Sequence, residues 1–129
     1  MTIELTMLFW ATVLTFVQVV VAVMLANTQV SLPELAGNRE GISLSGMAGR
    51  AKRAHANMLE SLVLFAVLIV VVQIAGLNND LTALGAQIFV IARLIYAVIY
   101  VVGVPWLRTG IWSIAVIGMV MVAWPIVSA

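Results

Sequence analysis

One stretch of sequence decides the fold: Gly49-Arg-Ala-Lys-Arg-Ala-His-Ala-Asn-Met-Leu-Glu60 runs without a break into Ser61-Leu-Val-Leu-Phe-Ala-Val-Leu-Ile-Val-Val-Val72. The apolar second half predicts a membrane-spanning helix. Ionisable side chains are costly in hydrocarbon, so those that enter such a helix mark a functional site. At about 100° per residue, one stripe of roughly 80° holds the polar positions Arg50, Arg53, Asn57 and Glu60. One face of this helix is therefore polar, and the rest is compatible with lipid.

The composition agrees with a membrane protein. The chain has 129 residues, of which 64% are hydrophobic and 9% are charged, and this length predicts a single membrane domain spanning residues 1–129. The net charge of +1 and the absence of a basic run with interleaved aromatics argue against a nucleic-acid partner. Because the chain has no cysteine, any thiol chemistry must come from a bound ligand.

Four apolar stretches are long enough to cross a hydrocarbon core of about 30 Å. They span about residues 5–26, 54–75, 81–102 and 108–127. The first has an acidic flank at Glu4 and too long an apolar run for a secretory signal, so we interpret it as a retained helix. Loop 27–53 contains Pro33 and several glycines, which predicts a structured loop or a short re-entrant cover. The other connections are short, so the fold class is an all-α integral membrane protein with four helices in an up-down bundle.

The distribution of basic residues predicts the orientation. One side of the predicted membrane domain carries all the basic loop residues, namely Arg39, Arg50, Lys52, Arg53 and Arg108. Basic loops remain in the cytoplasm. We therefore expect loop 27–53 to be cytoplasmic and both termini to be non-cytoplasmic.

A second polar stripe lies on the third predicted helix, at Arg93, Tyr96 and Tyr100. Helical geometry puts Glu60 and Arg93 at depths that differ by only about 4 or 5 Å. We expect an intramembrane ion pair between them. Such a pair can serve ligand binding, or it can simply hold two helices together, because buried charges need partners wherever they occur.

Together the two stripes offer several hydrogen-bond donors near the cytoplasmic interface. This arrangement suits an anionic ligand with an amide backbone, since arginine forks carboxylates and tyrosine donates a hydroxyl from an apolar body. The alternative is that the basic residues reach lipid headgroups and the tyrosines form an interfacial belt. A zinc site is excluded because His55 is the only histidine and cysteine is absent.

The motifs resemble those of the MAPEG superfamily, the membrane-associated proteins in eicosanoid and glutathione metabolism. Residues 49–60 are similar to its second-helix pattern Glu-Arg-Val-x-Arg-Ala-x-x-Asn-x-x-Glu. Residues 92–100 are similar to its Ala-Arg-x-x-Tyr-x-x-x-Tyr, and Pro105 with Arg108 resembles the bacterial members. The resemblance implies a homotrimer in a bacterial inner membrane, with glutathione held between neighbouring subunits.

The resemblance also implies roles for individual residues. Family positions that bind glutathione, together with their polar neighbours, give the candidate binding set Arg50, Arg53, His55, Asn57, Glu60, Arg93, Tyr96 and Tyr100. Helical geometry directs His55 away from the main stripe, so it would meet the ligand or a neighbouring subunit from another side. Arg108 is the candidate catalytic residue that stabilises the glutathione thiolate. The alternative for Arg108 is a positive-inside anchor at the start of the fourth helix.

The leading hypothesis is a membrane glutathione transferase or peroxidase that acts on hydrophobic small-molecule electrophiles, with glutathione as co-substrate and membrane lipid as its surroundings. The rival is a non-catalytic trimeric scaffold or lipid-binding protein whose polar seam is structural. A small transporter is disfavoured because no predicted helix is interrupted by glycine or proline at mid-membrane in the way transport sites require.

Overall fold

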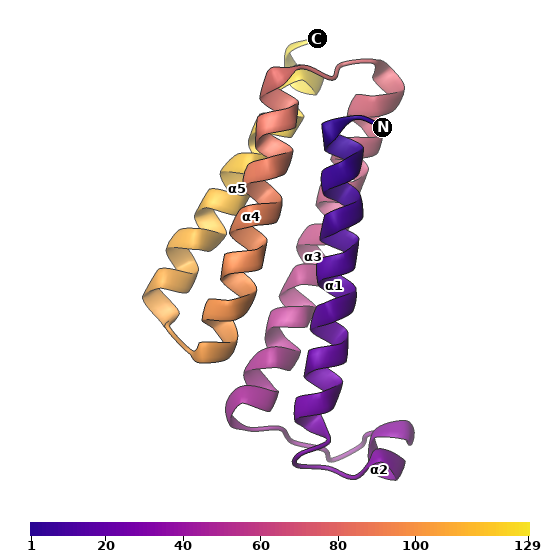
Figure 1. Cartoon of the computed structure of the whole chain (residues 1–129), viewed down its shortest axis with the longest axis vertical. Helices are drawn as coiled ribbons and strands as arrows, with labels where there is room; N and C mark the ends of the chain where they lie inside the picture. Colours follow the sequence, from indigo (N-terminus) through magenta and orange to yellow (C-terminus); the bar gives the residue numbers. More distant parts are fainter.

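The computed structural model describes all residues, 1–129, and consists only of helices and their connections. Four long helices are α1 (Ile3–Ala26), α3 (Gly46–Ala75), α4 (Asp80–Val102) and α5 (Pro105–Ser128), as Figure 1 shows. Each is long and apolar enough to cross a membrane. The predicted fold class, an all-α membrane protein with four spanning helices, is confirmed.

The helices form two antiparallel pairs, α1 with α3 and α4 with α5 (Figure 1). Both chain termini lie at one end of the bundle, which we call the terminal end. The short helix α2 (Leu32–Ala36) lies at the other end, which we call the α2 end. The two pairs lie close together near the terminal end and diverge toward the α2 end.

Glycine lets α4 and α5 approach each other closely. A Cβ atom added at Gly85 would lie 2.6 Å from the carbonyl oxygen of Gly118, and one added at Gly118 would lie 2.6 Å from that of Gly85. Backbones at this separation leave no room for a side chain at either position, as in other closely packed membrane helices. This contact fixes the α4–α5 pair, which carries most of the polar site.

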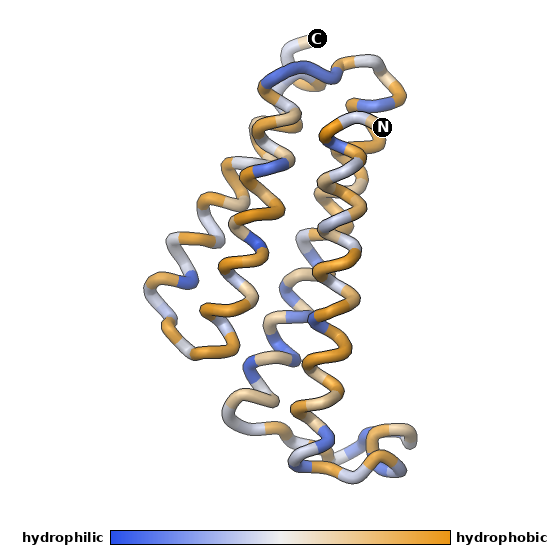
Figure 2. Tube along the Cα trace, in the orientation of Figure 1, coloured by the Kyte–Doolittle hydropathy of each residue, from blue (hydrophilic) through white to orange (hydrophobic).

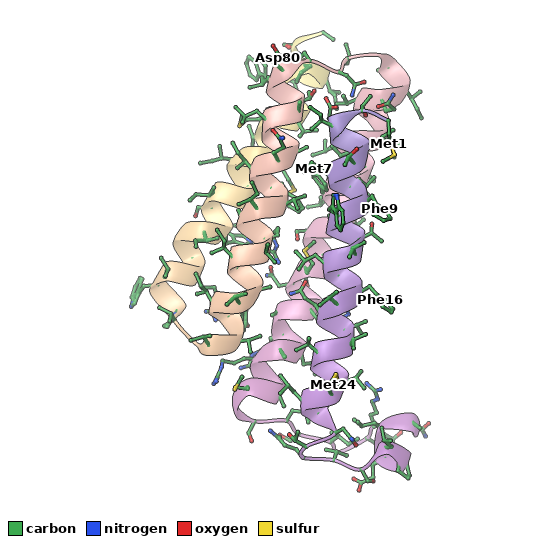
Figure 3. All side chains as sticks on the ribbon, in the orientation of Figure 1. Met1, Met7, Phe9, Phe16, Met24 and Asp80 are labelled. Carbon is green, nitrogen blue, oxygen red and sulfur yellow. The ribbon has the colours of Figure 1, made fainter.

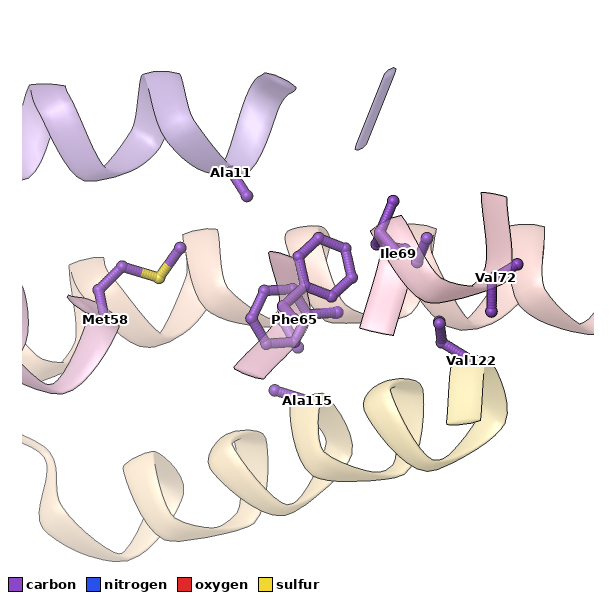
Figure 4. Packing of buried hydrophobic residues seen from close by; sticks show 10 residues of the cluster. Ala11, Met58, Phe65, Ile69, Val72, Ala115 and Val122 are labelled. Carbon is purple, nitrogen blue, oxygen red and sulfur yellow. The ribbon is translucent and has the colours of Figure 1, made fainter. Parts of the chain in front are cut away.

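The apolar core is a narrow column along the bundle axis (Figure 4). Its centre is the stacked pair of Phe65 and Phe89, whose ring centroids are 4.1 Å apart. Most other apolar side chains face outward, including Phe9, Phe16 and Met24 along α1 (Figure 3). Figure 2 shows hydrophobic residues along all four long helices, and hydrophilic residues near both ends and part-way along α3 and α4. This distribution is that of a protein whose surroundings are lipid.

The helix boundaries differ from the expected ones in loop 27–53. Helix α3 begins at Gly46 rather than near residue 54, and α2 forms inside the predicted loop. Gly49 does not break α3, because it is needed for packing: a Cβ atom there would lie 2.8 Å from the carbonyl oxygen of Leu44. Ser31 accepts a hydrogen bond at the N-cap of α2, and Pro33 lies in its first turn. These are helix-start signals rather than breakers.

Candidate ligand-binding site

A polar cavity of about 300 Å³ opens between α3, α4 and α5. Its six lining residues are Asn57, Tyr96, Tyr100, Arg108, Thr109 and Trp112. The structure therefore brings together four of the residues predicted from the sequence, from three different helices. The volume lies at the lower end of the range for small-molecule sites, about 300 to 1,000 Å³.

Two aromatic rings with a cation at each end form a row beside this cavity. The guanidinium carbon of Arg93 lies 4.2 Å from the ring centroid of Tyr96, and that of Arg108 lies 4.5 Å from the centroid of Tyr100. The two tyrosine rings meet edge to face, with centroids 5.6 Å apart. We call these four residues the Arg–Tyr ladder. The α4 members share one helix face because they are three and four residues apart.

Arg108 reaches the ladder because α4 ends sharply. Gly103 adopts φ of +95°, a left-handed conformation that glycine adopts at little cost, and α5 starts two residues later at Pro105. The short turn returns the chain antiparallel to α4 and lays the first turn of α5 beside Tyr100. The ladder therefore depends on this turn as much as on the spacing within α4.

Arg93 is the most unusual residue of the site. It is 1% exposed, and none of its three guanidinium nitrogens has a hydrogen-bond partner within the chain. The expected Glu60–Arg93 ion pair is wrong for the single chain, because Glu60 is exposed and Arg93 has no acceptor. Glu60 lies one turn beyond Asn57 on the same polar stripe of α3, but its side chain is exposed and only Asn57 lines the cavity. A buried guanidinium without an acceptor is costly, so it calls for one from outside the chain.

Asn57 also has a buried polar atom without a hydrogen-bond partner, and it lines the cavity. Its side-chain oxygen Oδ1 is buried and accepts no hydrogen bond. Most buried polar atoms in proteins are paired, so an unpaired acceptor in a ligand-sized cavity suits an incoming N–H or O–H group. Asn57 thus offers the cavity an acceptor, and the unpaired guanidinium of Arg93 lies against Tyr96, which lines the same cavity.

Arg50 and Arg53 do not line this cavity. The Nε atom of Arg50 donates a hydrogen bond of 2.8 Å to the carbonyl oxygen of Val101, in the last turn of α4. A cation there satisfies a free carbonyl and stabilises the helix end. Arg53 is exposed, and its Nη1 would lie 3.2 Å from a Cβ atom on Gly49.

His55 lies on the other side of α3, as its helical position predicts. It lines a separate cavity of about 320 Å³ among apolar residues, together with Arg39 and Lys52. Its Nδ1 atom is buried and has no partner. The side chains expected to bind one ligand are therefore divided. Asn57 and the Arg–Tyr ladder lie together, His55 lines a different cavity, and Arg50, Arg53 and Glu60 line neither cavity.

Sequence reasoning missed Thr109 and Trp112 as lining residues. Trp112 lies four residues beyond Arg108 on the same face of α5, so helical spacing from Arg108 could have identified it. Thr109 is only one residue from Arg108, so spacing from Arg108 does not indicate it. No group of three or more histidine, aspartate or glutamate side chains is arranged to hold a metal ion.

The fold and this cavity define a class of protein: a four-helix integral membrane protein with a ligand-sized polar site between its helices. The sequence matches the MAPEG family over residues 5–128. The chain belongs to this family of membrane four-helix bundles, as the sequence motifs predicted. It is therefore a membrane protein related to glutathione or eicosanoid metabolism. No curated protein and no solved structure matches the chain.

Proposed function

We propose that the protein is a membrane glutathione transferase or peroxidase that acts on hydrophobic electrophiles. The observation that carries this proposal is the polar cavity, where three members of the Arg–Tyr ladder lie beside the unpaired acceptor of Asn57, namely Tyr96, Tyr100 and Arg108. Glutathione is a tripeptide with two carboxylates, two amide groups and one thiol. Its groups complement a site built from guanidinium groups, phenol hydroxyls and one amide.

The chemistry of each residue supports a specific role. Asn57 Oδ1 accepts a backbone N–H of the tripeptide, and Arg93 binds a carboxylate that supplies its missing acceptor. Arg108, held over Tyr100, provides positive charge near the thiol. A nearby guanidinium favours the thiolate over the thiol, and the thiolate is the nucleophile. The sulfur then attacks an electrophilic carbon of a substrate dissolved in the membrane.

The two separate cavities that α3 borders support binding between subunits. His55 and the Arg–Tyr ladder line separate cavities, so one glutathione that touches both must lie between two copies of the chain. In this proposal the protein is a homotrimer, the usual assembly of the family. The cavity around His55, Arg39 and Lys52 then forms the neighbouring subunit's side of each site. Glu60, exposed in the single chain, is available to the same interface.

Charge supports the proposed orientation. The basic residues of the α2 end, Arg39, Arg50, Lys52, Arg53 and Arg108, far outnumber those of the terminal end. The α2 end is then cytoplasmic, both termini are non-cytoplasmic, and a bacterial inner membrane is the expected location. Glutathione from the cytoplasm enters at this end, and the apolar substrate arrives through the lipid.

The rival proposal, a non-catalytic scaffold, gains support from Arg50, whose hydrogen bond to Val101 is structural. Thermal unfolding of the detergent-purified protein separates the two. Reduced glutathione at about 100 times its dissociation constant should stabilise the protein by about 2.7 kcal/mol. Asn57→Leu should reduce this stabilisation, whereas the matched change Asn78→Leu at the terminal end should leave it intact. An intact trimer that glutathione does not stabilise would favour the scaffold.

A further inference from the structure

We propose that a groove between α1 and α4 binds one anionic phospholipid, with an acyl chain in the groove and the phosphate on Arg50. The groove consists of two cavities, of about 310 and 350 Å³, that share the lining residues Leu14, Val17 and Leu94. Neither cavity shares a lining residue with the polar cavity or with the cavity around His55. The lipid site is therefore separate from the proposed glutathione site and does not depend on it.

Small side chains create the groove in the region where the two helix pairs diverge (Figure 1). Ala51 and Ala54 of α3 and Ala97 of α4 all line it, and all three are buried. Val98 of α4 also lines it and is 59% exposed, so the groove borders the surrounding lipid. An apolar hollow that opens to lipid suits a flexible hydrocarbon chain.

The length of the groove favours a lipid chain over a helix of another subunit. Its lining residues on α4 run from Val90 to Val102, which corresponds to about 18 Å along the helix axis. Half of a hydrocarbon core of about 30 Å is about 15 Å. The groove thus runs from the α2 end to just beyond mid-membrane, as one acyl chain does. A transmembrane helix would need a groove that crosses the whole core.

Arg50 supplies the charge for the headgroup. Its Nε atom donates a hydrogen bond of 2.8 Å to the carbonyl oxygen of Val101, which holds the guanidinium at the α2 end of the groove, beside the lining residues Val101 and Val102. Its two terminal nitrogens make no hydrogen bond within the chain. Guanidinium N–H groups bind phosphate oxygens in pairs, and basic residues between helices at the membrane surface are typical of anionic lipid sites.

Gln18 is the only residue lining either cavity that is not hydrophobic. It lies three residues before Val21 on α1, which places it about 5 Å deeper in the membrane. Its Oε1 atom is buried and has no hydrogen-bond partner. Rotation of the amide exchanges Oε1 and Nε2, so the same position can present an N–H donor. The ester groups of a phospholipid lie just below the phosphate, and an ester carbonyl can accept this hydrogen bond.

Trp10 lines the deep end of the groove and allows a direct test. The changes Trp106→Phe, Trp112→Phe and Trp124→Phe together leave Trp10 as the only tryptophan. This full-length variant is placed in vesicles of phosphatidylcholine and phosphatidylglycerol, with bromine on the acyl chains of one lipid or the other. Bromine quenches tryptophan fluorescence on contact, so the quenching gives the relative association constant of the two lipids. Phosphatidylglycerol should be preferred by about fivefold, the effect of one basic group near the membrane surface.

Matched variants locate the preference. Arg50→Gln in the same background should reduce the ratio of association constants to about one, whereas Arg53→Gln, at an exposed arginine one turn away, should leave it at about fivefold. A variant that keeps only Trp124, which lines neither cavity of the groove, should show no preference between the lipids. These controls separate binding at Arg50 from general attraction of anionic lipid to a basic protein.

Three outcomes would overturn the proposal. An equal preference at Trp124 would indicate general charge attraction, and a preference that survives Arg50→Gln would mean that Arg50 does not bind the phosphate. If neither lipid quenches Trp10, another occupant covers the groove, such as a second copy of the chain.

A second measurement uses the protein with all its tryptophans, in case the variant with one tryptophan does not fold. Phosphatidylglycerol added to the detergent-purified protein should raise the unfolding temperature more than phosphatidylcholine does. Val98→Trp places a bulky side chain in the groove and should remove this difference. Val120→Trp, at a similarly exposed valine of α5 that does not line the groove, should keep it. Equal shifts with both lipids in the wild type would also overturn the proposal. Glutathione is absent from every sample, so the result is independent of the proposed function.

Discussion

The two ends of the bundle differ in whether their buried polar groups have hydrogen-bond partners within the chain. At the terminal end, the buried carboxylate of Glu4 accepts a hydrogen bond from the hydroxyl of Thr82, and Thr2 donates a bond of 2.9 Å to Gln73. In the half toward the α2 end, buried polar atoms of four residues have no partner, namely Gln18, His55, Asn57 and Arg93. No such orphan occurs in the terminal half.

This difference distinguishes polar groups that hold helices together from polar groups that bind a ligand or another subunit. Polar groups that only connect helices are expected to satisfy one another within the chain, and those of the terminal end do. Unpaired acceptors and a buried guanidinium are expected where a ligand or a neighbouring subunit supplies the missing partner. The comparison predicts that mutations at the terminal end affect stability, and that those near the α2 end affect ligand binding.

The largest expected effect is on ligand binding, at Arg93. Arg93→Leu should abolish the stabilisation by glutathione, about 2.7 kcal/mol at 100 times the dissociation constant of the wild type. The ligand-free protein should not lose stability, because replacing an unpaired buried charge by an apolar group is neutral or favourable. Thermal unfolding with and without glutathione measures both quantities. A variant that is destabilised without ligand would show that Arg93 has a structural partner. The proposed difference between the two ends would then be wrong.

The opposite pattern is expected at Glu4. Glu4→Ala removes a buried hydrogen bond to a carboxylate and leaves the Thr82 hydroxyl only the carbonyl oxygen of Asn79, 2.8 Å away. It should lower the free energy of unfolding by about 1 to 3 kcal/mol. The glutathione-dependent stabilisation should remain at its wild-type value, since Glu4 lies far from the cavity along α1. Glu4→Gln, which keeps a hydrogen-bonding side chain, serves as the conservative control and should lose less. A lost response to glutathione in a folded Glu4→Ala variant would contradict the division between the two ends.

Periodicity explains which parts of the site could be predicted from the sequence. The stripe of Arg93, Tyr96 and Tyr100 follows from helical spacing alone, and so does the separation of His55 from it. The Glu60–Arg93 pair failed because equal depth in two helices does not make two side chains face each other. That depends on how each helix is rotated about its axis, which is set by its packing against all its neighbours.

Two features of the site depend on tertiary packing and could not be predicted from residue spacing: the start of α3 and the position of Arg108. The early start of α3 depends on Gly49, where a side chain would collide with the backbone of Leu44. From the sequence alone, a glycine required by packing is indistinguishable from a glycine that ends a helix. The placement of Arg108 over Tyr100 likewise depends on the turn at Gly103, whose conformation is a property of the α4–α5 connection.

The smallest expected effect is on stability, at Arg50. This residue lies at the α2 end but already has a hydrogen-bond partner within the chain, so it tests whether pairing, rather than location, marks a structural residue. Its Nε atom satisfies the carbonyl of Val101, and Gly103 leaves room for it: a Cβ atom there would lie 3.3 Å from Nε. Arg50→Gln should therefore lower the free energy of unfolding by about 0.5 to 1 kcal/mol, with no change in the stabilisation by glutathione. Arg53→Gln, the same change at an exposed arginine one turn away, is the matched control and should leave unfolding nearly unchanged. If Arg50→Gln instead weakened glutathione binding, Arg50 would belong to the ligand site, and pairing within the chain would no longer distinguish structural from binding residues at this end.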